Sequence, residues 1–191
     1  MNSVAAKRVF AISLVVAIIS MIGDAKAQLL DRALSLRDLS FQLQTPESIT
    51  KYMWHNFTFE SDQKNFGREE YWQTAEEFMD TQKGDCEDFA IFANTMLQMN
   101  GVTSFLLNIY GGRFSHTVCV FKENDKYNVI DGTDVLRYQS EDITKLISQI
   151  YPFWKKAAIV KAAADTPGSY GVILKEFEKK HKRMHLFGLS A

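Results

Sequence analysis

The spacing of the apolar residues changes abruptly at Asn100-Gly101, and this change limits the folds open to the chain. Residues 85–100 carry apolar side chains in steps of three and four, the period of an amphipathic helix (Phe89, Phe92, Ala93, Met96 and Leu97). After the break, apolar and polar residues alternate in segments rich in β-branched and aromatic residues, which predicts strands over 103–110, 115–121 and 126–132. Helices followed by a short antiparallel sheet predict an α+β domain.

Other segments have weaker patterns. We expect further helices over 45–57, 69–82, 140–150 and 170–185, with a lead-in helix or arm over 28–44. Thr45 and Pro46 are typical of a helix start, and Ser140 is the expected cap of the helix over 140–150. Residues 58–68 are polar and predict a loop, while residues 151–160 fit a turn followed by a strand or a helix.

The N-terminus has the composition of an export signal. Lys7 and Arg8 precede an apolar stretch of 15 residues, 9–23, and Ala25-Lys26-Ala27 places small residues where a signal peptidase reads them. The stretch is shorter than the roughly 20 residues of a spanning helix. We therefore expect residues 1–27 to be a cleaved signal peptide and 28–191 to be a periplasmic or secreted domain without stable membrane insertion. An uncleaved membrane anchor is the alternative.

Composition indicates one globular domain and argues against some partners. The chain has 191 residues, of which 46% are hydrophobic and 24% are charged, as in proteins with a packed core. Its net charge of -1 gives no general attraction to nucleic acid or to anionic lipid. The basic residues within 175–185 fit a solvated helix face better than a partner-binding patch.

The stretch KGDCEDFA, residues 83–90, places a thiol among three carboxylates at the start of the helix predicted over 85–100. Asp85 can act as the N-cap and Asp88 falls at the third helical position, as in a capping box. Carboxylates are stabilised at a helix N-terminus, so these acids need no chemical role. This arrangement makes Cys86 the first helical residue, at the positive end of the helix dipole.

His116 and Asp131 lie on two adjacent predicted strands joined by a short polar turn. A two-residue loop at Glu123-Asn124 would set them directly opposite each other. A loop at Asn124-Asp125 would make them diagonal neighbours on the same face, still within reach. A three-residue loop would separate them onto opposite faces, so the register decides whether they pair.

A thiol at a helix N-terminus, an imidazole and a carboxylate are the groups that acyl transfer through a cysteine requires. The helix end and a neighbouring imidazolium lower the thiol pKa, His116 moves the proton, and Asp131 orients the ring. Taken singly, the three are also an ordinary core cysteine, strand histidine and turn aspartate. Cys119 lies three residues after His116, hence on the other strand face, so we expect it in the core and not in a disulfide with Cys86.

The segments GDCEDFAIFANTMLQMNG, SHTVCVF and KYNVIDGT resemble the transglutaminase-like superfamily, and especially the bacterial transglutaminase-like cysteine proteinases. The resemblance covers about residues 45–135 and implies a papain-like core with Cys86, His116 and Asp131 as a catalytic triad. It further implies a thiol protease or amidase that cleaves protein or peptide amide bonds through a thioester. A glutamine cross-linking transamidase and a non-catalytic binding module of the same fold are the alternatives.

The resemblance also implies two further sets of site residues. The family stabilises its oxyanion with the backbone N–H of the nucleophile and an upstream side chain, for which Trp72 or Gln73 are the candidates; Trp72 also fits a core aromatic. The chemistry requires no cofactor, but the family can bind calcium beside the cysteine, here through Asp85 and Glu87. Two carboxylates fall short of the six ligands that calcium takes, so N-capping is the competing role.

Overall fold

The computed structural model describes residues 36–112, 115–162 and 171–179. The chain divides into two compact units, 1–42 and 43–191, and in the first of them residues 36–42 are helical. The predicted signal peptide, 1–27, lies outside the described residues. Within the described part of the chain, no helix is both long and apolar enough to cross a membrane.

The second unit begins with helices and ends with a sheet, as the change in apolar spacing predicts. The first half contains α2 (Pro46–Asn56), β1 (Thr58–Phe59), α3 (Asp62–Asn65), α4 (Ala75–Thr81), β2 (Lys83–Gly84) and α5 (Cys86–Met99). The second half contains β3 (Ser104–Tyr110), β4 (Ser115–Glu123), β5 (Lys126–Asp131), β6 (Asp134–Ser140), α6 (Ile143–Ile150), β7 (Lys156–Lys161) and β8 (Val172–Glu178).

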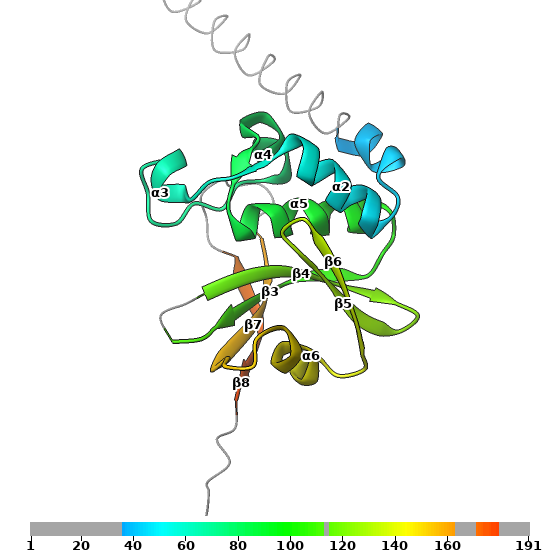
Figure 1. Ribbon diagram of the computed structural model, residues 1–191, viewed down its shortest axis with the longest axis vertical. Helices are drawn as coiled ribbons and strands as arrows, with labels where there is room; N and C mark the ends of the chain where they lie inside the picture. The colour runs from blue at the N-terminus through cyan, green and yellow to red at the C-terminus, as the bar shows by residue number, and fades with distance from the viewer. Residues whose placement is uncertain (1–35, 113–114, 163–170, 180–191) are drawn as a thin grey trace, which may run out of the picture. The chain divides into compact units, whose positions relative to one another are not determined.

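The six strands β3–β8 form one antiparallel sheet in the order β6-β5-β4-β3-β7-β8. Figure 1 shows α5 on one side of this sheet and α6 on the other. Alternate strand residues (Leu107, Ile109, Val118, Val120, Val129 and Ala157) pack with Trp154 and with Leu146 and Ile147 of α6 in one core cluster. The intervening residues, Cys119 among them, are buried towards α5, which contacts β3, β4 and β5. This is an α+β fold with the long helix packed on an antiparallel sheet.

The helix predicted over 69–82 begins only at Ala75, so the prediction is wrong for residues 69–74. In a helix that began at Glu69, the Gln73 N–H would donate to the Glu69 carbonyl. It donates instead to Asp88 Oδ1 at 2.9 Å, while the Tyr71 N–H donates to the carboxylate of Asp62. The Asp88 side chain therefore takes an N–H that the longer helix would need, and Thr74 caps α4 one residue later.

Three further expectations need correction. The loop predicted over 58–68 contains β1 and α3, because β1 finds a parallel partner in β2. The helix predicted over 170–185 is wrong where it is described: residues 172–178 form β8, which pairs with β7. Ser140 ends β6, a strand that the sequence analysis missed, and the N-cap of α6 is Asp142, which accepts the Lys145 N–H at 2.7 Å.

Candidate active site

The start of α5 is fixed by the capping box that the sequence predicts. The Asp85 side chain accepts the backbone N–H of Asp88, and Asp88 Oδ2 accepts the backbone N–H of Asp85 at 3.1 Å. Gly84 has to be glycine here, because a Cβ would lie 2.2 Å from Asp88 Oδ2. These contacts make Cys86 the first residue of a helix that is buried along most of its length.

The hairpin of β4 and β5 has the second of the registers considered above. Its two-residue loop is Asn124-Asp125, with φ values of 52° and 59°, as a tight primed turn requires. Ile130 pairs with Cys119, which makes His116 and Asp131 diagonal neighbours on one face. Their side chains meet, and His116 Nε2 lies 2.8 Å from Asp131 Oδ1.

Cys86 contacts β4 where that strand runs past the end of β5. Asp131, the last residue of β5, is in register with Val118, so residues 115–117 of β4 extend beyond it. Residues 115–117 still pair with β3, but they have no partner in β5. Here the backbone N–H of Thr117 donates to the Cys86 thiol. His116 lies on the strand face of Val118, and Cys86 lies beside the backbone of the next residue of β4, Thr117.

A cavity of about 420 Å³ is shared by all three candidate catalytic residues. The described residues that line it are Trp54, Phe57, Thr58, Phe59, Cys86, Phe89, His116, Asp131, Gly132 and Thr133. Cys86, His116 and Asp131 come from a helix start, a strand and a strand end that are distant in the sequence. The fold therefore gathers a thiol, an imidazole and a carboxylate at one opening.

The electrostatics around the thiol oppose its ionisation. Burial raises the pKa of Cys86 first, and the Glu87 carboxylate, with Oε2 3.1 Å from Sγ, raises it further. The Thr117 N–H lowers the thiol pKa, but by less. The helix N-terminus and the Thr117 N–H therefore do not by themselves produce the low thiol pKa that the sequence analysis expects.

Four carboxylates gather beside Cys86. Asp62, Glu87 and Asp88 are buried, and Asp85 is half-buried. Burial is the first cause that raises the pKa of Asp62 to about 6, that of Asp88 to about 7 and that of Glu87 to about 10. Contact with Asp85 adds to the rise for each of them. Packing so many acids together is costly unless a proton or a cation lies between them.

Two oxygens in this cluster point to a cation. The Oδ1 atoms of Asp62 and Asp85 are buried and have no hydrogen-bond partner among the described residues. Asp62, Asp85 and Asp88 each bring one carboxylate oxygen within 4.8 Å of the others, and ligand atoms of Asp85, Cys86 and Glu87 are grouped equally closely. Carboxylate oxygens are the donors that calcium prefers, so the residues fit this ion.

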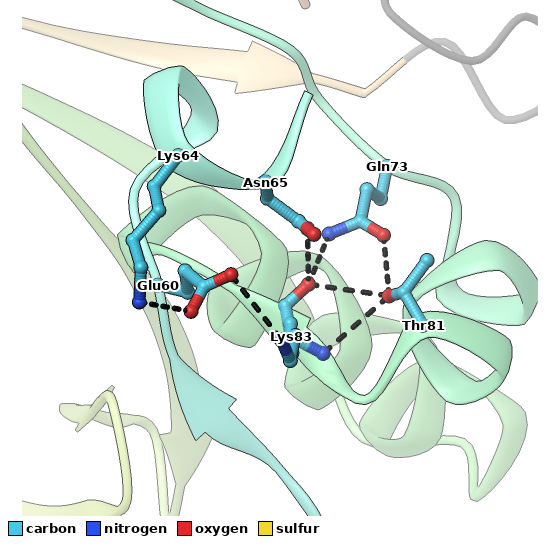
Figure 2. Close-up of polar contacts among 6 residues, drawn as sticks. All are labelled: Glu60, Lys64, Asn65, Gln73, Thr81 and Lys83. Carbon is cyan, nitrogen blue, oxygen red and sulfur yellow. Dashed lines mark hydrogen bonds and ion pairs between the residues drawn. The ribbon is translucent and has the colours of Figure 1, made fainter. Parts of the chain in front are cut away.

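The side chain of Gln73 is held by hydrogen bonds within the fold, and Figure 2 shows those to Lys83 and Thr81. Its Nε2 donates to Lys83 O and to Asp88 Oδ2, both at 2.8 Å, and its Oε1 accepts from the Thr81 hydroxyl at 2.7 Å. Trp72 is buried, and its indole N–H donates to Glu70 at 3.2 Å. Neither is among the described residues that line the cavity.

Sequence reasoning missed several residues that shape this site. Asp62 lies in a polar segment where no spacing distinguishes it, and Thr117 acts through its backbone. Trp54 did carry a signal. It falls outside the apolar face of α2 that contains Ile49 and Met53, so the helical spacing places this large aromatic side chain on the exposed side.

Comparison with known proteins decides the family. Residues 30–151 match the family described as a transglutaminase-like domain, which is more than half of the chain. The chain belongs to the transglutaminase-like domain family. This membership agrees with the segments that carry the resemblance, all of which lie within the matched residues. No curated protein matches the chain.

Solved structures to which the chain is similar include LapG of Legionella pneumophila. The calcium-bound form is 21% identical with a TM-score of 0.43, and the match covers 64% of this chain and 70% of that chain. For the EGTA-treated form the values are 19%, 0.45, 70% and 76%. A candidate cysteine protease from Cytophaga hutchinsonii is 11% identical with a TM-score of 0.42, over 78% of this chain and 52% of that chain.

Proposed function

We propose that this protein is a cysteine hydrolase that cleaves an amide bond in a protein or peptide through a thioester on Cys86. The observation that carries the proposal is the shared cavity, which Cys86 enters from a helix N-terminus and the paired His116 and Asp131 enter from the sheet. Each of these residues has an ordinary structural explanation alone. Their convergence at one opening, in a member of the transglutaminase-like family, favours catalysis.

The contact with Asp131 supports a role for each ring nitrogen of His116. Because Nε2 faces Asp131, Nδ1 is the nitrogen that would take the thiol proton. The sulfur of Cys86 then attacks the amide carbon, and the C–N bond breaks as His116 returns the proton to the leaving amine. In the second step His116 takes a proton from a water molecule, and the water oxygen bonds to the carbonyl carbon of the thioester. The C–S bond breaks, His116 returns the proton to the sulfur, and the product leaves as a carboxylic acid.

The backbone of α5 supplies an oxyanion donor. The N–H of Cys86 is one of the first four in the helix, which have no partner within it, and the dipole favours negative charge there. Such a donor is worth about 10²–10³ in rate. We assign no oxyanion role to Trp72 or Gln73.

We further propose that Asp85 and Glu87 bind calcium together with Asp62. Asp62 brings an oxygen from α3 that the sequence motif alone does not reveal, and its unpaired Oδ1 supports the assignment. A bound calcium ion would supply positive charge that offsets the carboxylates around Cys86. Glu87 would then no longer raise the thiol pKa, which is the obstacle that the electrostatics present to this mechanism.

Export completes the proposal. The apolar stretch 9–23 and the small residues at Ala25 and Ala27 support cleavage after residue 27 and a periplasmic or secreted enzyme. Mass spectrometry of the protein recovered from the producing cells tests this directly. A mature form that begins at Gln28 supports the proposal, and a chain that keeps residues 1–27 in the membrane fraction contradicts it.

The test of the function is cleavage of a denatured protein mixture, with new termini identified by mass spectrometry. We expect cleavage by the wild-type protein with Ca²⁺ present, none with Cys86→Ala, and retained cleavage with the matched control Cys119→Ala. Cleavage by Cys86→Ala would refute the assignment of the nucleophile. Incorporation of a labelled amine without new termini would instead favour the transamidase, and neither reaction would favour a binding module.

A further inference from the structure

The cavity beside Cys86 has an aromatic wall that the proposed chemistry does not use. Phe57 and Phe89 form its buried part, with ring centroids 6.2 Å apart in an edge-to-face arrangement. Phe59 stacks on Phe89, with centroids 6.5 Å apart and ring planes at 27°. Trp54 and Phe59 remain 71% and 69% exposed. Large aromatic surfaces that stay exposed at the mouth of a cleft are a mark of a binding surface.

The described polar residues that line the same cavity include no charged side chain that is available to pair with a charged substrate group. Among the described lining residues there is no lysine, arginine or glutamate, and the titratable side chains are Cys86, His116 and Asp131. Asp131 is already paired with His116. A charged substrate side chain would be desolvated here without a partner, which is costly. The wall therefore favours an apolar side chain.

The backbone of β1 indicates that the occupant is an extended peptide. Thr58 N–H donates to Gln82 O at 2.9 Å and Glu60 N–H donates to Gly84 O at 2.8 Å, so both residues bond towards β2. Backbone groups alternate in direction along a strand, so the N–H and C=O of Phe59 point away from β2. A peptide can pair with this edge as an added strand, beside the ring of Phe59 that lines the cavity.

We propose that Trp54 and Phe59 form the subsite for a bulky apolar side chain of an extended peptide substrate, next to the bond that Cys86 attacks. The inference rests on the proposed function and adds the substrate class to it. Gly132 and Thr133, in the loop between β5 and β6, line the same cavity and leave space in it for a substrate side chain. A Cβ built on Gly132 meets nothing within 4 Å.

The test is digestion of a peptide library derived from a natural proteome, with Ca²⁺ present, by the wild-type protein and by three variants. Trp54→Ala and Phe59→Ala remove the wall, and Phe153→Ala removes an aromatic side chain that is 82% exposed and does not line the cavity. Aligned cleavage sites give the preference at each position. The size of that preference is the kcat/KM of a cleaved peptide divided by the kcat/KM of the same peptide with alanine at the preferred position. The rate of Cys86 alkylation by iodoacetamide reports on the nucleophile itself.

We expect a bulky apolar residue to be enriched at one position beside the cleaved bond, with a kcat/KM about tenfold or more above that of the alanine analogue. Trp54→Ala and Phe59→Ala should each lose most of this ratio and keep the iodoacetamide rate, while Phe153→Ala keeps both. Cleavage without a preferred apolar position, or a preference that survives in both wall variants, overturns the subsite and leaves the hydrolase standing. No cleavage and no alkylation at Cys86 overturn the proposed function and the subsite with it.

Discussion

Replacing Gln73 by leucine separates two roles that the sequence and the structure give to this residue. The variant keeps the side-chain volume but removes three hydrogen bonds, to Lys83 O, Asp88 Oδ2 and the Thr81 hydroxyl. Two of these are neutral and worth about 1 kcal/mol each, and the bond to the buried carboxylate is worth about 1.5–3 kcal/mol. We therefore expect a loss of about 4 kcal/mol in the free energy of unfolding and a Tm lower by about 10 °C.

Urea unfolding, followed by circular dichroism, measures this loss as a lower midpoint at an unchanged slope. Gln63→Leu, at an exposed position of α3, is the matched control and should change the stability by less than about 0.5 kcal/mol. If Gln73 were the oxyanion donor, kcat/KM would fall by about 10²–10³ while the stability stayed near that of the wild type. A stability loss below about 1 kcal/mol would refute this network, of which Figure 2 shows the bonds to Lys83 and Thr81.

Three further predictions test the cation, the helix start and a surface ion pair. Calcium at about 100 times its Kd should stabilise the protein by about 2.7 kcal/mol, or about 5–10 °C in Tm; EGTA should reverse the gain and Asp62→Asn should abolish most of it, so a Tm indifferent to both would contradict the site. Gly84→Ala should lower the free energy of unfolding by about 3 kcal/mol or more, because its Cβ displaces the bonded carboxylate of Asp88, and a near-neutral result in urea would be inconsistent with the close contact. The Arg137 guanidinium lowers the pKa of Glu47, so the pair stabilises the fold above the ordinary carboxylate pKa and less as pH falls through the lowered one. Both groups are exposed, so Arg137→Ala should cost at most about 1 kcal/mol at pH 7 and progressively less as acid protonates Glu47, and a cost that does not change with pH would argue against the ion pair.

The sequence predicts those parts of the fold whose interactions are local. The capping box of Asp85 and Asp88 and the three strands that follow Gly101 depend on near neighbours, and all are found in the structure. The helix predicted over 69–82 is shortened by carboxylates of distant segments. The strand at 172–178 depends on the free edge of β7, which no local pattern reveals.

The same distinction applies to the candidate site. The pairing of His116 and Asp131 could be narrowed to two registers, because a tight turn links their strands, and the structure has the diagonal one. Asp62 could not be predicted as part of the carboxylate cluster, because only the folded α3 brings it to Asp85. The raised pKa of the Cys86 thiol follows from burial, which sequence spacing does not measure.

The account rests on proton transfer between Cys86 and His116, and the most direct measurement is the pH dependence of Cys86 alkylation by iodoacetamide in the calcium-loaded protein. We expect the rate in the wild type to rise at a pH well below that of an ordinary thiol, to move to higher pH in His116→Ala, and to stay unchanged in His55→Ala, an exposed histidine of α2. A wild-type profile with an ordinary thiol pKa that is indifferent to His116→Ala would contradict the hydrolase proposal.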